Sequence, residues 1–153
     1  MKTRRRLDIR TVIRRLLAGQ KLGVLATRES RAPYQSLVAF TASGDLRRIY
    51  FATEIKTRKY ANLIRSPQVS MLFDNRRRAG SDFNRGIAVA ALGRAEEVKA
   101  GSIKEILSLH LKKHPTLRDF VESPSCRLFQ VGVKAYIVVT EFQQVRKYNP
   151  ADR

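Results

Sequence analysis

The alternation of apolar and polar residues predicts a chain built mainly from β-strands. Short runs rich in β-branched and aromatic side chains recur along it, separated by polar or glycine-containing turns. The expected strands are residues 22–27, 33–41, 48–53, 69–74, 87–98, 126–133 and 136–145. The last two are expected to form two long strands or one bent hairpin. Gly93, inside the fifth run, predicts a bulge or a close backbone approach.

The N-terminal part of the chain predicts a basic amphipathic helix. Apolar side chains recur at helical spacing over residues 8–18, with Asp8 placed to cap the start and Gly19 placed to end the helix. Packing of this apolar stripe on the protein body is the simpler interpretation. A helix lying on a membrane surface is the alternative.

Two further helices are expected between strands. They span residues 56–65 and residues 102–113, and each is followed by a proline. Ser102 and Glu105 have the spacing of a capping box at the start of the second helix. Residues 117–121 are expected to add one helical turn.

These elements predict an α+β protein dominated by β-structure. The expected fold is a six- to seven-stranded antiparallel β-barrel with two to three peripheral helices, because closure removes the exposed edges of a sheet. The sequence contains no repeat and no interdomain linker. Residues 1–153 are therefore expected to form one domain, with a basic helix in residues 1–20 and a frayed tail at residues 146–153.

The chain is strongly basic. It carries 31 Lys and Arg residues against 13 Asp and Glu residues, a formal net charge of +18. Such a field attracts polyanions, so nucleic acid must be weighed as a partner. The arginine runs are Arg4–Arg6, Arg14–Arg15, Arg47–Arg48 and Arg76–Arg78. Because they are scattered and no RNA-recognition signature accompanies them, a solvated basic surface is the preferred interpretation.

The sequence favours a cytoplasmic protein. Cys126 is the single cysteine, which excludes an internal disulfide and a thiolate zinc site. No apolar run approaches the roughly 20 residues needed to span a bilayer. The N-terminus is basic but lacks the apolar segment of a signal peptide, so export is not expected.

The most informative stretch is TEIKTRKYAN, residues 53–62. It places Lys56, Arg58 and Lys59 at the start of the second expected helix, where the helix dipole disfavours cations. A bound phosphate would reverse the sign of that interaction, and the hydroxyls of Thr53 and Thr57 could add hydrogen bonds. A solvated basic turn is the alternative.

Four motifs together give the chain a family resemblance. They are PYQSLVAF (33–40), YFATEIKTRKYANL (50–63), SPQVSMLF (66–73) and GIAVAALGRAEEV (86–98). In this order and spacing they resemble the pyridoxamine 5′-phosphate oxidase-like family of FMN-binding split β-barrels. The resemblance covers roughly residues 22–98, whereas the C-terminal strands match only in general character.

The resemblance implies a homodimer with FMN in a groove at the subunit interface. The triplet Thr57, Arg58 and Lys59 would bind the FMN phosphate. Of the family's Tyr-Thr pair on the third strand, only Thr53 is present, because Ala52 replaces the tyrosine. The second strand would line the isoalloxazine ring mainly with backbone groups. The residues expected there are Ser36, Leu37, Val38 and Ala39.

The chain also departs from the oxidase. Ser36 and Thr41 stand where the oxidase has an Arg and a Lys, so two cationic contacts to the flavin are missing. The chain has no Trp and ends in YNPADR, without the segment that holds pyridoxal phosphate. Pyridoxamine phosphate oxidation is therefore not expected. The hypothesis is a flavin-dependent oxidoreductase of unknown substrate and electron donor, with no catalytic residue assigned.

Other functions remain as alternatives. One is a non-catalytic module that binds flavin or nucleic acid. Another is a haem-binding or haem-degrading split barrel, with His110 or His114 as ligand. These two histidines are spaced i, i+4, but no third ligand accompanies them, so a pair at a helix C-terminus is preferred and no metal site is expected. Cys126 lacks an activating partner and is expected to be a small buried residue.

Overall fold

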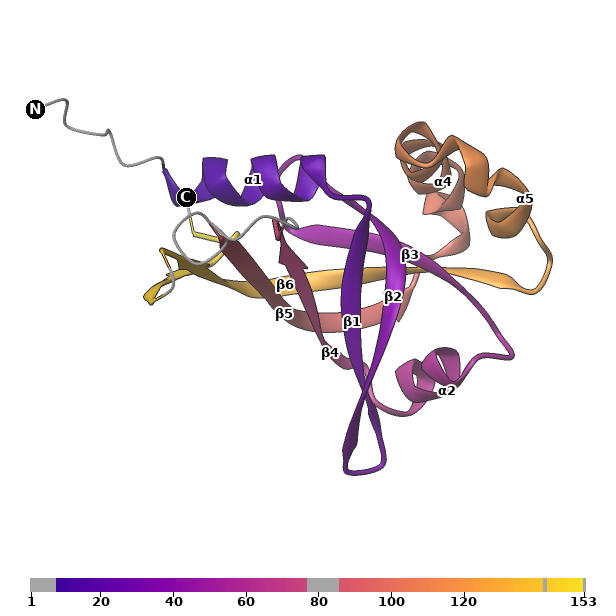
Figure 1. Cartoon of the computed structure of the whole chain (residues 1–153). Helices are drawn as coiled ribbons and strands as arrows, with labels where there is room; N and C mark the ends of the chain where they lie inside the picture. The colour runs from indigo at the N-terminus through magenta and orange to yellow at the C-terminus, as the bar shows by residue number, and fades with distance from the viewer. Residues whose placement is uncertain (1–7, 77–85, 142, 153) are drawn as a thin grey trace, which may run out of the picture.

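The computed structural model describes residues 8–76, 86–141 and 143–152, and its centre is a closed antiparallel barrel. The strand order is β3-β2-β1-β4-β5-β6-β7, and pairing between β3 and β6 closes the barrel. β7 extends from β6 as an added strand (Figure 1). This confirms the expected fold class. The strands are β1 Leu22–Glu29, β2 Ala32–Ala42, β3 Arg48–Glu54, β4 Gln68–Asp74, β5 Ile87–Glu97, β6 Cys126–Thr140 and β7 Gln144–Tyr148.

Alternate residues of the strands fill the barrel interior, as a half-buried strand requires. Ile49 and Phe51 of β3 are fully buried, and the ring of Phe51 stacks on that of Phe129 of β6 with centroids 5.7 Å apart. Phe40 and Phe73 form a second ring pair across the core, with centroids 4.4 Å apart. The interior is therefore a packed aromatic and aliphatic core.

The longest pairing in the sheet joins β5 and β6. Its register shifts between Leu92 and Gly93, and a Cβ atom at Gly93 would collide with the carbonyl oxygen of Gly132. Both expectations for Gly93 are confirmed: it lies at an irregularity of the strand and at a close backbone approach. The side chain is excluded because the neighbouring backbone occupies its space.

Four α-helices of the described chain lie around the barrel. They are α1 Ile9–Gly19, α2 Arg58–Arg65, α4 Ile103–Lys113 and α5 Arg118–Val121. Figure 1 shows α1 and α2 at opposite ends of the barrel, with α4 and α5 beside β3. Asp8 caps α1 as expected, because its carboxylate accepts a hydrogen bond from the N–H of Thr11 at 3.3 Å. Among these helices, none is long and apolar enough to cross a membrane.

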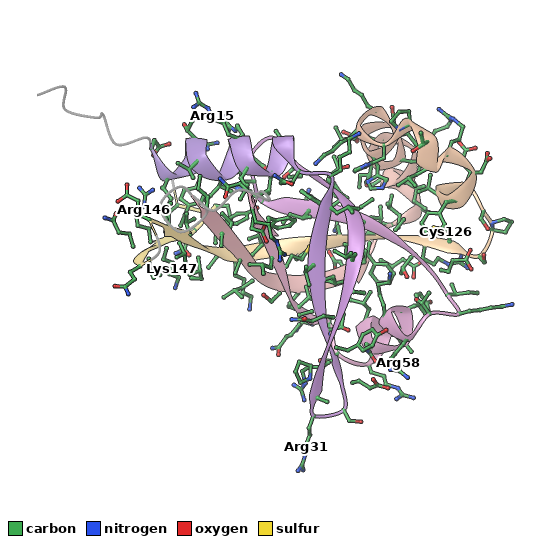
Figure 2. All side chains as sticks on the ribbon, viewed as in Figure 1. Arg15, Arg31, Arg58, Cys126, Arg146 and Lys147 are labelled. Carbon is green, nitrogen blue, oxygen red and sulfur yellow. The ribbon has the colours of Figure 1, made fainter. Side chains whose placement is uncertain are left out.

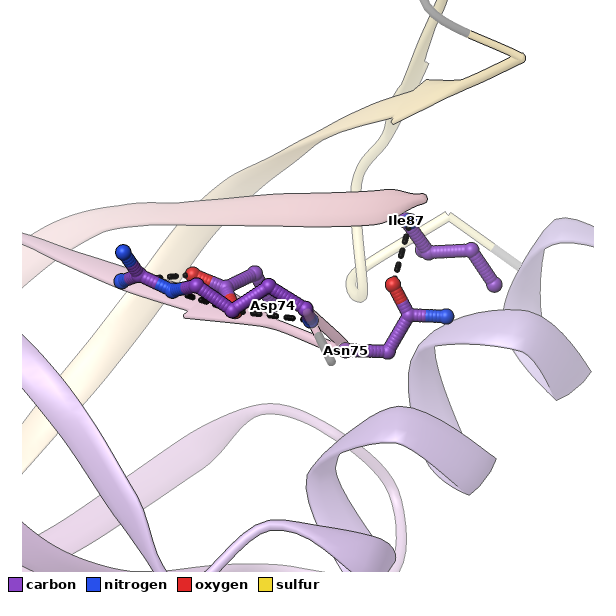
Figure 3. A network of polar contacts seen from close by, with 4 residues as sticks. Asp74, Asn75 and Ile87 are labelled. Carbon is purple, nitrogen blue, oxygen red and sulfur yellow. Dashed lines mark hydrogen bonds and ion pairs between the residues drawn. The ribbon is translucent and has the colours of Figure 1, made fainter. Parts of the chain in front are cut away.

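The turn from β4 to β5 is tied at its base by side chains. Asn75 accepts a hydrogen bond from the N–H of Ile87 at 2.7 Å, and Arg76 pairs with Asp74 at 2.9 Å (Figure 3). Arg76, one of the three arginines of the expected basic run, therefore forms an ion pair within its own turn. The rest of that run, Arg77 and Arg78, lies outside the described residues.

Two expectations for the C-terminal part are wrong. Residues 126–140 form the single strand β6, with no break between residues 133 and 136, because the pairing with β5 skips Lys134 and continues. The tail over residues 146–153 is not frayed where it is described. Residues 146–148 belong to β7, and Pro150 is buried with its carbonyl accepting from Arg47 at 3.3 Å.

The expected capping box of α4 is also wrong. Ser102 precedes the helix, but its hydroxyl makes no capping hydrogen bond. A 3₁₀ turn over Ala100–Ser102 leads into α4 and gives Ser102 a φ of −107° and a ψ of −7°. An N-cap residue normally has extended backbone, so the helical conformation at Ser102 removes the capping geometry.

Candidate functional site

The start of α2 is built by the connection from β3. Thr57 caps α2 by accepting from the N–H of Tyr60 at 3.2 Å, and its hydroxyl donates to the carbonyl of Glu54 at 2.8 Å. The fully buried Thr53 places its hydroxyl 2.9 Å from that of Thr57. Both hydroxyls therefore hold the turn in shape. Lys56 lies outside α2 and is exposed, because the helix begins two residues later than expected.

Arg58 and Lys59 occupy the first turn of α2, which contains no acidic residue. The guanidinium of Arg58 lies 5.2 Å from the ring centroid of Tyr34, and its Nε lies 3.6 Å from Glu29. Lys59 is half-buried, and burial lowers the pKa of its amine. No carboxylate of the described chain forms an ion pair with Lys59. We call Thr57, Arg58 and Lys59 the α2 turn.

The α2 turn lies beside an open stretch of backbone. β2 pairs with β1 from Ala32 to Ala39, but it pairs with β3 only from Phe40 to Ala42. Residues 32–39 of β2 therefore have no strand neighbour on the β3 side within the described chain. We call this stretch the open edge of β2. Its unpaired N–H and C=O groups can hydrogen-bond a ligand.

The four expected β2 residues all lie on this open edge, on its two faces. Val38 is buried in the core, and Ser36 lies opposite the buried Leu25 of β1. Ser36 has a buried hydroxyl without a hydrogen-bond partner. Leu37 and Ala39 lie on the opposite face, where Leu37 is 67% exposed. A ligand outside the barrel would meet backbone atoms of this strand and few polar side chains.

The electrostatics of the α2 turn favour an anion. The N-terminus of a helix carries a partial positive charge and free N–H groups, and the two cations add to that field. Contact with Tyr34 of β2 holds Arg58 next to the open edge. The arrangement can therefore hold a phosphate at the α2 turn and a planar hydrogen-bonding group along β2.

His110, on α4, and His114, which follows the last residue of α4, are both buried against β2. His110 Nδ1 lies 2.9 Å from the hydroxyl of Thr41, and His114 Nε2 lies 2.7 Å from the carbonyl oxygen of Phe40. Burial is the main cause that lowers both pKa values, that of His110 to about 4. These contacts fasten α4 to β2. Within the described chain, no group of three or more potential metal ligands is found.

Cys126 is not an activated thiol. It is half-buried at the start of β6, and burial together with the nearby charge of Glu54 raises its pKa. A raised pKa leaves the thiol protonated at neutral pH, which opposes nucleophilic chemistry.

An apolar surface on the outside of the barrel was not anticipated from the sequence. Leu37 lies opposite Val24, which lies opposite Leu72 on its other side, so one row crosses β2, β1 and β4. The exposed fractions are 67% for Leu37, 55% for Leu22, 41% for Leu72 and 40% for Leu92. We call these four leucines the outer apolar face. Only the strand register, which the sequence does not reveal, brings them together.

Comparison with known proteins gives a family and a fold. The sequence profile of the family described as pyridoxamine 5′-phosphate oxidase matches residues 9–136. No curated protein sequence matches the chain.

Several solved structures share the fold at low sequence identity. A haem-binding protein from Mycobacterium smegmatis has a TM-score of 0.84 at 15% identity, covering 95% of this chain and 59% of that one. General Stress Protein 26 from Bacillus anthracis has a TM-score of 0.71 at 16% identity, covering 94% and 99%. A FAD-binding protein from Mesorhizobium loti has a TM-score of 0.68 at 17% identity, covering 86% and 94%. The chain therefore spans only part of the first of these proteins.

Proposed function

The chain belongs to the pyridoxamine 5′-phosphate oxidase family, and from this premise we propose that it binds FMN as a flavin-dependent oxidoreductase. The family often binds flavin, and one similar structure is a FAD-binding protein. The observation that carries the proposal is the α2 turn beside the open edge of β2. Flavin, when bound, supplies the hydride or electron chemistry.

Different residues of the site contact the phosphate and the ring of FMN. Arg58 and Lys59 contact the phosphate, and Thr53 and Thr57 keep the turn in the conformation that presents its N–H groups. Backbone groups of Ser36–Ala39 hold the ring along the open edge. The role of Lys56 is the smallest, because it is exposed and precedes the helix.

The substrate differs from that of the oxidase itself. The chain has no Trp, and Thr41, which stands where the oxidase has a Lys, is neutral and makes its hydrogen bond with His110. These features support a flavin protein that does not oxidise pyridoxamine phosphate. No residue in the described site has the environment of an evident catalytic acid or base.

Flavin titration tests this proposal. Purified protein is stripped of bound small molecules and titrated with FMN, while the flavin absorbance and fluorescence are followed. Saturable binding with a shifted flavin spectrum is the expected result. Protein that leaves FMN fluorescence unchanged at all concentrations would refute the proposal.

We also propose that the protein is a homodimer joined through the outer apolar face. Its four leucines carry no charge, whereas the chain as a whole has a net charge of +18. Two basic molecules can approach through an uncharged surface with the least repulsion, and burying four leucines favours association. In the family arrangement the partner subunit completes the flavin groove.

Sedimentation tests the dimer. The variant Leu37→Glu places a charge at the most exposed leucine of the outer apolar face and is expected to sediment as a monomer. The variant Leu109→Glu is a matched control, because Leu109 is 41% exposed on α4 and is not part of this face. Wild-type protein that is monomeric at all concentrations would overturn the dimer.

The positions of the basic residues do not favour a dedicated nucleic-acid interface. Arg15 lies on α1, Arg31 on the β1–β2 hairpin, Arg58 at α2 and Arg146 and Lys147 on β7 (Figure 2). These side chains project from different elements at different ends of the molecule. A dispersed positive surface attracts nucleic acid only through salt-dependent, sequence-independent contacts.

A further inference from the structure

A cavity of about 310 Å³ lies between α1, α4 and the connection from β2 to β3. Its walls are mostly apolar and come from Leu17, Ala18, Ala42 and Leu46. Arg14 and Lys113 also line it, and no acidic residue does. We call it the α1–α4 cavity. Its size is at the lower end of the range of small-molecule sites.

The two cations of the cavity are held in place by backbone acceptors. Arg14 donates to the carbonyl of Gly44 at 3.0 Å, and Lys113 donates to the carbonyl of Leu17 at 2.9 Å. The ammonium of Lys113 also lies 3.9 Å from the ring centroid of Phe40. Each cation keeps further N–H groups, because an ammonium has three donors and a guanidinium five.

The charge near the cavity is not balanced by carboxylates. Asp45 follows Gly44 in the chain, but it does not line the cavity, and the cations that act on its carboxylate are Arg47 and Arg48. The C-terminus of α1, whose last carbonyl groups are free of helix hydrogen bonds, contributes a partial negative charge of about half an elementary charge. That charge offsets only part of the positive charge of Arg14 and Lys113, so the cavity remains positive.

We propose that the α1–α4 cavity binds a small organic carboxylate with an apolar body. Arg14 and Lys113 pair with the carboxylate, and the leucine and alanine walls contact the body. The apolar contact is necessary because the α1 terminus weakens the attraction for any anion. A small inorganic anion therefore binds poorly here. Carboxylate binding in the α1–α4 cavity does not require bound flavin.

Calorimetric titration with octanoate tests this site in flavin-free protein. Octanoate is expected to bind saturably, and 1-octanol, which has the same chain without the charge, is expected to bind about tenfold or more weakly. Burial lowers the pKa of Lys113 to about 8. A paired carboxylate favours the ammonium form, so binding at pH 8 should take up protons, seen as a dependence of the heat on the buffer.

Two pairs of variants locate the site. Arg14→Gln and Lys113→Met are each expected to weaken octanoate binding about tenfold. The controls Arg15→Gln and Lys112→Met change exposed neighbours that do not line the cavity, and they should bind as wild type. Arg14 is exposed, so its variant should fold even if Lys113→Met does not. Absence of octanoate binding, equal binding of octanol, or equal loss in Arg15→Gln would overturn the proposal.

Discussion

The α2 turn and the α1–α4 cavity both place two cations against the barrel, but the nearby helix ends carry partial charges of opposite sign. Arg58 and Lys59 lie at the N-terminus of α2, where the helix dipole and the charges add. Lys113 donates to the carbonyl of Leu17 in the last turn of α1, and Arg14 lies in the middle of the same helix, so the partial negative charge of that helix end offsets part of their positive charge. The same residue types therefore have different consequences. The α2 turn attracts a compact anion, whereas the cavity depends on apolar contact.

The two regions also differ in how their lysines are satisfied. Lys113 has a backbone acceptor and an aromatic face as partners. Lys59 is half-buried and has no ion-pair partner in the described part of the chain. A buried cation without a counter-charge is costly. A bound phosphate would remove this cost at the α2 turn, which is why we assign the flavin phosphate there.

The largest expected effect is a loss of folding stability at low pH, which we attribute to the buried His110 of α4. Burial lowers the pKa of His110 from 6.5 to about 4. The unfolded chain therefore takes up a proton at pH values where the native state does not. The contribution of His110 to stability should be constant above pH 6.5 and fall as the pH drops towards 4, by about 3 kcal/mol.

Urea unfolding of wild type and His110→Gln between pH 7 and pH 4 measures this effect. The variant is expected to be less stable at pH 7 but to lose less stability on acidification. Carboxylates titrate alike in both proteins, so the difference between the two curves reports the titration of His110 together with its coupling to His114. Parallel curves would contradict a buried neutral histidine.

An effect of intermediate size, stabilisation by a bound anion, should distinguish the α2 turn from the α1–α4 cavity. Inorganic phosphate at about ten times its dissociation constant is expected to stabilise wild type by about 1.4 kcal/mol. Lys59→Met should lose this gain, and Arg65→Ala, which changes the last turn of the same helix, should keep it. Octanoate should still stabilise Lys59→Met, because it binds the other region. Thermal unfolding in the presence of each anion measures both stabilisations. If phosphate stabilised Lys59→Met as much as wild type, phosphate would not bind at the α2 turn.

The smallest effect concerns Glu29. Its ion pair with Arg58 is 3.6 Å long, and the two side chains are 45% and 60% exposed, so the pair adds little stability. Glu29→Gln should release Arg58 for the phosphate and tighten FMN binding about twofold. The control Glu122→Gln breaks a similarly exposed pair with Arg118 on α5 and should leave FMN affinity unchanged. Weaker FMN binding in Glu29→Gln would show that Glu29 instead positions Arg58.

Local patterns predicted most of the fold. The strand spacing, the cap at Asp8 and the irregularity at Gly93 depend on neighbouring residues and are confirmed. The capping box at Ser102 failed because a 3₁₀ turn changed its backbone. The unbroken β6 depends on pairing with β5, which alternation within one strand does not reveal.

The candidate site was only partly predictable. The position of Arg58 and Lys59 at the start of a helix was predictable from the sequence, although nothing in the sequence placed Glu29 and Tyr34 beside Arg58. The burial of His110 and His114 was missed because their partners, Thr41 and Phe40, are 69 and 74 residues away. The α1–α4 cavity likewise combines segments that are distant in sequence.

Parallel titrations with FMN and riboflavin test the central assignment most directly, because the two ligands share a ring system and differ by the phosphate. Wild type is expected to prefer FMN by about tenfold or more, as charge-assisted contacts to a phosphate require. Lys59→Met should lose most of that preference, and Arg65→Ala should retain it. Equal affinity of wild type for FMN and riboflavin would contradict a phosphate site at the α2 turn.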